Sequence, residues 1–330
     1  SGAIGGAGFG AFVLDTSEMV GASARSTFAL VNNAGYVDVS CSVDYPVWKG
    51  AGDGTWVTGG PTDGDWRLAS APATLTDFLA GDAPLLDDTA TGVTTVNISA
   101  ADVAPTSVVV SIDTKAYTIN GAYAIAGTGS VIKRGTNVLT MAATNKFSGQ
   151  LTVEAGTLAV STVNNASANG PLGNSALPVI LGKAGGGTGT LEYTSISTNS
   201  SSKPFTMAAG GAGAFQIDNS GTIMTNSGAI NGGGDLIKTG AGTLVLSGAN
   251  NYGRSLVNSG TLQFAKPGSL CNGITNNWIP ANITVESNAV FALNLGGAGE
   301  FTAGSLTNLL DSVHMGGGAA NSARRALATS

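Results

Sequence analysis

The chain has 330 residues, of which 50 are glycine and 10% are charged, whereas average proteins contain about 7% glycine and about 25% charged residues. A hydrophobic content of 42% excludes a disordered chain, which would combine low hydrophobicity with high charge. A net charge of −6 with scattered lysines and arginines argues against nucleic-acid binding, and we expect no membrane-spanning helix because no apolar run reaches about 18 residues.

Residues 1–47 lack any repeated pattern, and we treat them as an N-terminal extension. Between positions 36 and 45, apolar residues alternate with polar ones, which predicts a strand with one apolar face. The apolar side chains of this strand are Val37, Val39, Cys41, Val43 and Tyr45. Two interpretations stay open: the strand caps the following domain, or it joins a neighbouring subunit, as exposed sheet edges do.

Residues 48–95 are rich in tryptophan and aspartate, and we expect them to cap the domain that follows. Trp48, Trp56 and Trp66 could instead form a glycan platform, because aromatic rings stack on the apolar faces of sugars. Carboxylates could bind calcium or hydrolyse glycosides, but the spacing here fits no EF-hand loop. The aspartates concerned are Asp53, Asp63, Asp65, Asp82, Asp87 and Asp88.

Residues 96–310 consist of short strand-like runs separated by glycine and asparagine clusters, which turn the chain sharply because they tolerate positive φ. Two stretches are copies of each other. Lys133, Gly135 and Asn145 lie 105 residues before Lys238, Gly240 and Asn250, and the same offset joins Leu139 to Leu244, Met141 to Leu246 and Phe147 to Tyr252. One residue is missing from the second copy just after Tyr252, and beyond this point equivalent residues of the two copies are 104 positions apart. Such internal repetition indicates a solenoid.

The second copy, residues 234–264, carries Lys-x-Gly-x-Gly-Thr-Leu-x-Leu-x-Gly-x-Asn-x-Tyr followed by Gly-Thr-Leu. This motif resembles the autotransporter-associated β-strand repeat. The resemblance implies an all-β, right-handed parallel β-helix displayed outside a bacterial cell, with a non-repeat N-terminal segment. The first copy, residues 129–160, departs from the motif at the Gly-x-Gly corner and has Phe147 in place of tyrosine. The repeat indicates a fold and a location but no particular biochemical activity.

Residue types needed for common catalytic chemistry are scarce, so we expect no enzyme activity, no cofactor and no metal. The one histidine, His314, lies in the glycine-rich tail at residues 311–330. The sequence contains no nucleophile-elbow motif with which this histidine could form a catalytic triad, and one histidine with two cysteines does not make a zinc site. The two cysteines, Cys41 and Cys271, could form an intramolecular disulfide, bridge two subunits or remain free thiols.

We expect a protein of the cell surface or extracellular space whose signal peptide has been removed. The favoured function is that of a structural subunit that self-assembles into a homopolymeric fibre or layer, end to end or by strand addition. This follows because the open ends of a solenoid are unpaired sheet edges. The alternative is a monomeric adhesin whose loops at residues 161–187, 195–204 and 266–281 contact glycans or host surfaces.

Overall fold

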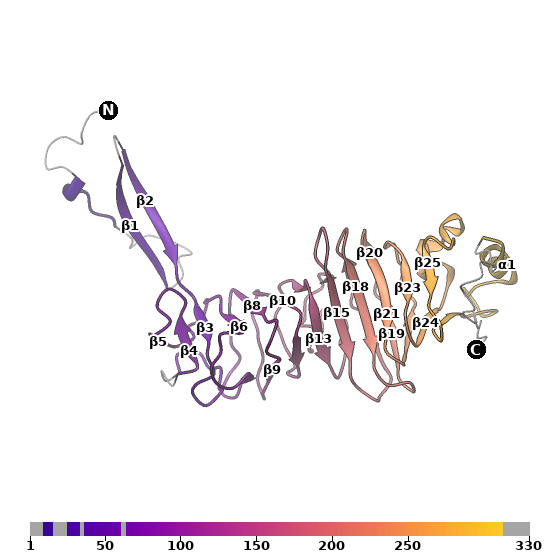
Figure 1. The fold of residues 1–330 in the computed structure, drawn as a ribbon, viewed down its shortest axis with the longest axis horizontal. Coiled ribbons are helices and arrows are strands. Elements are labelled where there is room, and N and C mark those ends of the chain that lie inside the picture. Colours follow the sequence, from indigo (N-terminus) through magenta and orange to yellow (C-terminus); the bar gives the residue numbers. More distant parts are fainter. Residues whose placement is uncertain (1–8, 16–24, 34–35, 61–63, 313–330) are drawn as a thin grey trace.

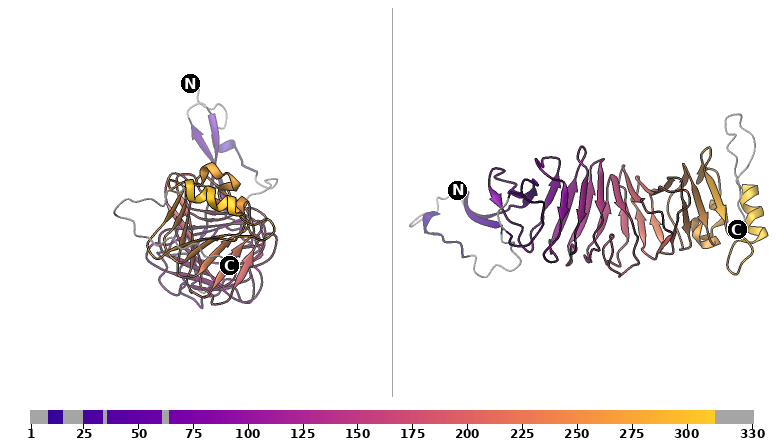
Figure 2. Two further views of the ribbon diagram at one scale, coloured as in Figure 1. Left: turned by 90° about the vertical axis from the view of Figure 1, so that its right-hand side faces the viewer. Right: turned by 90° about the horizontal axis from the view of Figure 1, so that it is seen from below.

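The computed structural model describes residues 9–15, 25–33, 36–60 and 64–312. The chain forms a rod of stacked coils, with a two-stranded hairpin standing out from one end and a helix at the other (Figures 1 and 2). Coils stack through parallel strand pairs, so the predicted parallel β-helix is confirmed.

The walls of the rod are three sheets. A ten-stranded sheet contains β3 (Pro46–Trp48), β4 (Trp66–Leu68), β5 (Leu75–Thr76), β6 (Leu85–Asp87), β8 (Ser107–Ser111), β10 (Ser130–Arg134), β12 (Leu151–Val153), β14 (Val179–Leu181), β17 (Phe205–Met207) and β20 (Ile230–Gly232). A nine-stranded sheet contains β7 (Thr95–Asn97), β9 (Tyr117–Asn120), β11 (Val138–Met141), β13 (Gly156–Val160), β15 (Thr188–Tyr193), β18 (Ala212–Ile217), β21 (Asp235–Thr239), β23 (Ser255–Val257) and β25 (Ile283–Val285). A five-stranded sheet contains β16 (Asn199–Ser201), β19 (Ile223–Asn226), β22 (Thr243–Leu246), β24 (Thr261–Phe264) and β26 (Val290–Leu293).

The core is a set of columns of apolar side chains inside the rod. Alternation along each short strand points every second residue inward, and parallel pairing then stacks these residues coil upon coil. In the nine-stranded sheet, for example, Leu139 pairs with Leu158, Leu158 with Leu191, and Leu191 with Phe215, all of them buried. One continuous core therefore runs along the rod.

Each copy of the repeat forms four strands in two adjacent coils. The first copy supplies β10 to β13 and the second supplies β21 to β24. The two copies turn at equivalent glycines, Gly135 and Gly240, which both have φ +74°. A Cβ atom at either position would lie 2.1 or 2.2 Å from a carbonyl oxygen of the preceding coil, so only glycine fits.

Both ends of the rod carry additional structure. At the N-terminal end, β4 pairs antiparallel with β3 and β5 pairs antiparallel with β4. At the other end, α1 (Ala303–Ser312) packs Leu309 against the last coil. The strands β3 and β6 already belong to the ten-stranded sheet, so the coils begin inside the segment that we expected to be a separate cap.

The remaining elements are a hairpin and short 3-10 turns. The hairpin consists of β1 (Ser26–Asn33) and β2 (Tyr36–Val43), and the turns are η1 (Phe9–Ala11), η2 (Pro267–Ser269), η3 (Cys271–Gly273) and η4 (Thr275–Asn277). No helix in the described part of the chain is long and apolar enough to cross a membrane.

Candidate functional site

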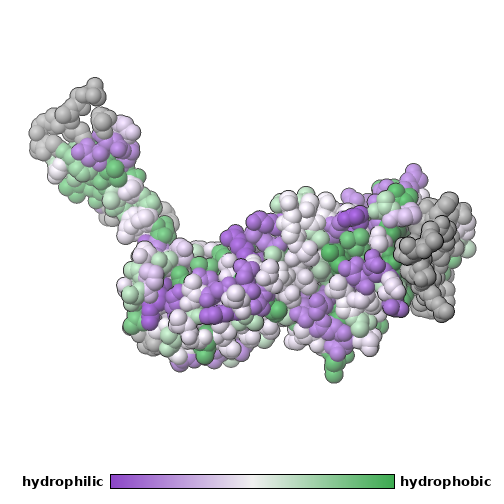
Figure 3. Space-filling model, viewed as in Figure 1, coloured by the Kyte–Doolittle hydropathy of each residue, from purple (hydrophilic) through white to green (hydrophobic). Residues whose placement is uncertain are grey.

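The N-terminal hairpin presents an apolar face that the rest of the described chain does not bury. The strand expected over residues 36–45 is β2, although it ends at Val43, before Tyr45. Register pairs place Phe28 opposite Cys41 and Leu30 opposite Val39, and paired residues share a face. Val39 and Val43 are 51% and 56% exposed, and Figure 3 shows hydrophobic residues along the hairpin.

Polar contacts anchor the base of the hairpin to the rod. The guanidinium of Arg25 lies 2.8 Å from a carboxylate oxygen of Asp82, and both side chains are almost fully buried. It also donates a 2.8 Å hydrogen bond to the hydroxyl of Thr76. On the other strand, Asp44 accepts hydrogen bonds from the hydroxyl and backbone N–H of Ser70. The hairpin is thus fixed at its base while its faces stay open.

The three tryptophans lie inside the first coils. Trp48, Trp56 and Trp66 are 0%, 0% and 4% exposed, and Trp66 packs edge-on against both others at centroid distances of 4.9 and 5.5 Å. The indole of Trp48 donates a 2.8 Å hydrogen bond to the carbonyl of Val93. Because neighbouring rings cover their faces, the alternative of a glycan platform at these residues is wrong, and they act as core of the capping coils.

The two cysteines are free thiols in separate regions. Cys41 is exposed on the hairpin, whereas Cys271 is half-buried in η3, between β24 and β25. The intramolecular disulfide is therefore wrong. Burial raises the pKa of the Cys271 thiol, which disfavours the reactive thiolate.

Aspartates near the N-terminal end bind backbone amides rather than one another. Buried Asp65 accepts hydrogen bonds of 2.9 Å from the N–H groups of Gly52 and Gly54. Asp88 accepts from the N–H groups of residues 113–115, the first of which does most to lower the pKa of this carboxyl to about 2. Among the residues that the structure describes, no group of three metal-ligating side chains occurs. Asp63 and His314 lie outside the described residues.

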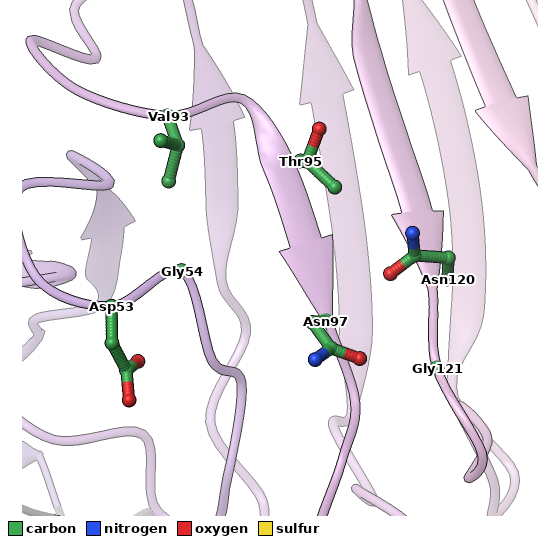
Figure 4. A pocket seen from close by; sticks show the side chains of 7 residues that line it. All are labelled: Asp53, Gly54, Val93, Thr95, Asn97, Asn120 and Gly121. Carbon is green, nitrogen blue, oxygen red and sulfur yellow. The ribbon is translucent and has the colours of Figure 1, made fainter.

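A shallow polar groove of about 470 Å³ crosses the first coils. It is lined by Asp53, Gly54, Val93, Thr95, Asn97, Asn120 and Gly121 (Figure 4). Asn97 and Asn120 are register partners on β7 and β9, so their side chains stack on neighbouring strands. Within the described residues, the side-chain amides of Asn97 and Asn120 form no hydrogen bond, whereas Asp53 accepts a 2.8 Å hydrogen bond from the N–H of Thr55. The groove therefore offers two stacked amides to a ligand rich in hydroxyl groups.

Three lysines are fully buried and reach into the core. Lys133 donates to the carbonyls of Arg134, Gly135 and Ala155, and Lys238, its repeat equivalent, donates to those of Thr239, Gly240 and Ser259. Lys203 donates to two carbonyls in the loop before β14. Burial lowers the pKa of each ammonium to about 8, whereas the carbonyl oxygens favour its charged form.

Asparagines of the repeat link consecutive coils in the same way. Asn250 accepts a 2.9 Å hydrogen bond from the N–H of Ile230 in the preceding coil and donates one of 2.8 Å to the carbonyl of Ser269 in the next. Asn145 makes equivalent contacts with Ile125 and Pro171. The most regular polar residues of the motif are thus structural, a role that we did not predict from sequence.

The three expected contact loops are anchored by internal contacts and also hold exposed residues, among them residues 183–187, 196–198 and 274–277. Residues 161–187 are held by Asn164, whose amide donates to the carbonyls of Ala168 and Gly173. Residues 195–204 contain strand β16. Residues 266–281 form η2 to η4 and bury Trp278. Exposed apolar side chains remain at Ile196 and Leu177.

Comparisons with known proteins agree with this architecture. The family model described as passenger-associated-transport-repeat matches residues 131–160 and 236–264. The adhesin BmaC autotransporter of Brucella suis biovar 1 (strain 1330) is 42% identical over 132 residues, which cover 38% of this chain and 4% of that protein. The chain thus spans a small part of the length of this relative. No solved structure matches. The matched residues are the two repeat copies, each of which builds two adjacent coils, so the chain contains two passenger-associated-transport repeats, and the expected resemblance to autotransporter-associated repeat proteins is confirmed.

Proposed function

We propose that this chain is a rod segment of a bacterial cell-surface adhesin, which holds a binding surface in a fixed shape and carries out no catalysis. The observation that carries the proposal is the polar groove at Asn97 and Asn120 in the first coils of the rod. The ligand class that fits is a glycan, because two stacked amides, each with donors and an acceptor, can pair with neighbouring sugar hydroxyls.

The similarity to a protein named as an adhesin supports a role at the cell surface. Assembly by end-to-end stacking receives less support. The antiparallel strands β4 and β5 lie at one end of the coils and α1 packs at the other, so neither described end is a bare row of parallel edges.

The test is binding of the purified chain to an immobilised glycan panel. Replacing both groove asparagines (Asn97→Ala with Asn120→Ala) removes two amides, each able to contribute about 1 kcal/mol, so we expect affinity to fall by roughly tenfold or more. The matched control is Asn231→Ala with Asn251→Ala, a second stacked pair of exposed asparagines far along the rod. Equal affinity of the groove variant and wild type on every bound glycan would reject the groove as the binding surface.

A further inference from the structure

We propose that β2 pairs edge to edge with β2 of a second copy of this chain, forming a two-fold symmetric dimer through a four-stranded sheet. A two-stranded hairpin alone is marginally stable, and three or more strands with a hydrophobic face are normally needed. Within the described residues, β1 and β2 form a sheet of only two strands, so the outer edge of β2 is unpaired.

Uncovered apolar surface concentrates on β2 rather than on β1. Val39 and Val43 are more than half exposed, whereas Phe28 and Leu30 on the same face are half-buried. The face holds no aspartate, glutamate, lysine or arginine, since Asp38 belongs to the opposite face. Edge-to-edge pairing therefore sets the apolar side chains of the two copies side by side on one face of the sheet, with no charged group of this face at the contact.

The hydrogen-bonding pattern of the hairpin restricts the register. Asp44 donates its N–H to the carbonyl of Arg25, so the alternation of antiparallel pairs leaves the backbone groups of residues 37, 39, 41 and 43 pointing to the outer edge. Two such strands form hydrogen bonds only when odd residues face odd residues. This same condition brings the two apolar faces onto one side.

One register uses all four outward-pointing residues of each strand. It places Val37 opposite Val43 of the second copy and Val39 opposite Cys41, with Ser40 on the two-fold axis. Four pairs that each exchange two bonds give about eight hydrogen bonds, whereas a shift by one step in either direction leaves about six. The same register sets Asp38 opposite Ser42, so no two carboxylates meet.

The antiparallel arrangement also keeps the rods apart. β2 runs from the hairpin tip toward the rod and continues directly into β3, as Figure 1 shows. Two antiparallel copies of β2 therefore place their rods at opposite ends of the shared sheet. The contacts of Arg25 and Asp44 already order the base of the hairpin, which reduces the entropy lost on association.

The first experiment is analytical ultracentrifugation of the chain over a range of concentrations. We expect wild type to reach twice its 32.4 kDa mass. Val39→Pro removes an N–H that points outward and is not used inside the hairpin, so it should raise the dimer dissociation constant at least tenfold. Leu30→Pro removes the matching N–H from the outer edge of β1 on the same rung and should leave the dimer intact. A wild-type monomer at all concentrations, or equal effects of the two prolines, would overturn the proposal.

The second experiment fixes the register by disulfide formation. Ser40→Cys, in a chain whose native cysteines are replaced by serine, places two thiols on the axis at a Cα separation of about 4.5 Å. With oxidised glutathione, the two thiols lose two protons and two electrons to the glutathione disulfide, which becomes two glutathione thiols, and a covalent dimer forms. Native Cys41 should stay uncrosslinked because its diagonal separation is about 7–8 Å. Crosslinking at Cys41 in place of Ser40→Cys would reject this register.

Discussion

The buried ammonium of Lys238 allows a direct test of whether side-chain hydrogen bonds hold neighbouring coils together. Its three carbonyl acceptors belong to its own turn and, at Ser259, to the next coil, so the side chain ties two coils. Lys238→Met keeps the apolar stem but leaves those carbonyls without this donor. Hydrogen bonds from a charged group contribute about 1.5–3 kcal/mol each, and desolvation of the ammonium offsets several kcal/mol of that sum.

The expected net loss for Lys238→Met is therefore about 3 kcal/mol. A solenoid unfolds coil by coil, so the appropriate assay is amide hydrogen exchange over β23 and β24. A loss of about 3 kcal/mol corresponds to a decrease in protection of roughly a hundredfold at these strands. The control is Lys183→Met. The side chain of Lys183 is 65% exposed, and its ammonium forms a long ion pair of 3.9 Å with Glu154, so its loss should change stability little. If Lys238→Met keeps wild-type protection, carbonyl solvation of the lysine merely balances its desolvation, and the coils are held by apolar packing.

Two further predictions concern the same contacts. Asn250→Ala should lower stability by about 2 kcal/mol in urea unfolding, because it leaves the N–H of Ile230 and the carbonyl of Ser269 unpaired; the exposed neighbour Asn251→Ala should change stability little, and equal losses would contradict the assignment. Stability should rise from pH 7.5 to 9.5, because the pKa of each buried lysine is lowered to about 8 while unfolded lysine titrates near 10.5, so the unfolded chain binds more protons in this window. The raised pKa of Tyr252 lowers stability only above pH 10, and a flat or falling urea midpoint between pH 7.5 and 9.5 would contradict the lysine assignment.

Sequence was informative about the fold because glycine corners and alternating strands are local features. The alternation over residues 36–45 was enough to predict β2. The sequence also contained a pattern that we did not use to predict the buried lysines. Lys133 lies two positions after buried Val131, and Lys238 lies two positions after buried Leu236. Strand periodicity places each pair on one face. We missed the buried lysines because charge normally outweighs periodicity in such a prediction.

Other features depended on contacts that sequence does not encode locally. A cluster of tryptophans in sequence is compatible with both a buried core and a sugar-binding platform. The rings are buried here because β4 pairs antiparallel with β3 and brings Trp66 against Trp48. The polar stretch Asn199–Ser201 has no apolar alternation, yet it is a strand because β19 of the next coil pairs with it. The groove at Asn97 and Asn120 likewise exists only once separate coils are stacked.

The positions of these features suggest a division of labour along the rod. Each repeat copy must keep its lysine, asparagine and corner glycine, because replacing any of them leaves buried backbone groups unpaired or creates a steric clash. Recognition residues must be free to differ from this pattern. The groove and the hairpin both lie in the N-terminal part, where neither repeat copy is found. The two repeat copies, whose lysine and asparagine side chains bond consecutive coils, can thus hold the shape of the rod. The non-repeat coils and the hairpin form the surfaces that we propose to bind a glycan and a second copy.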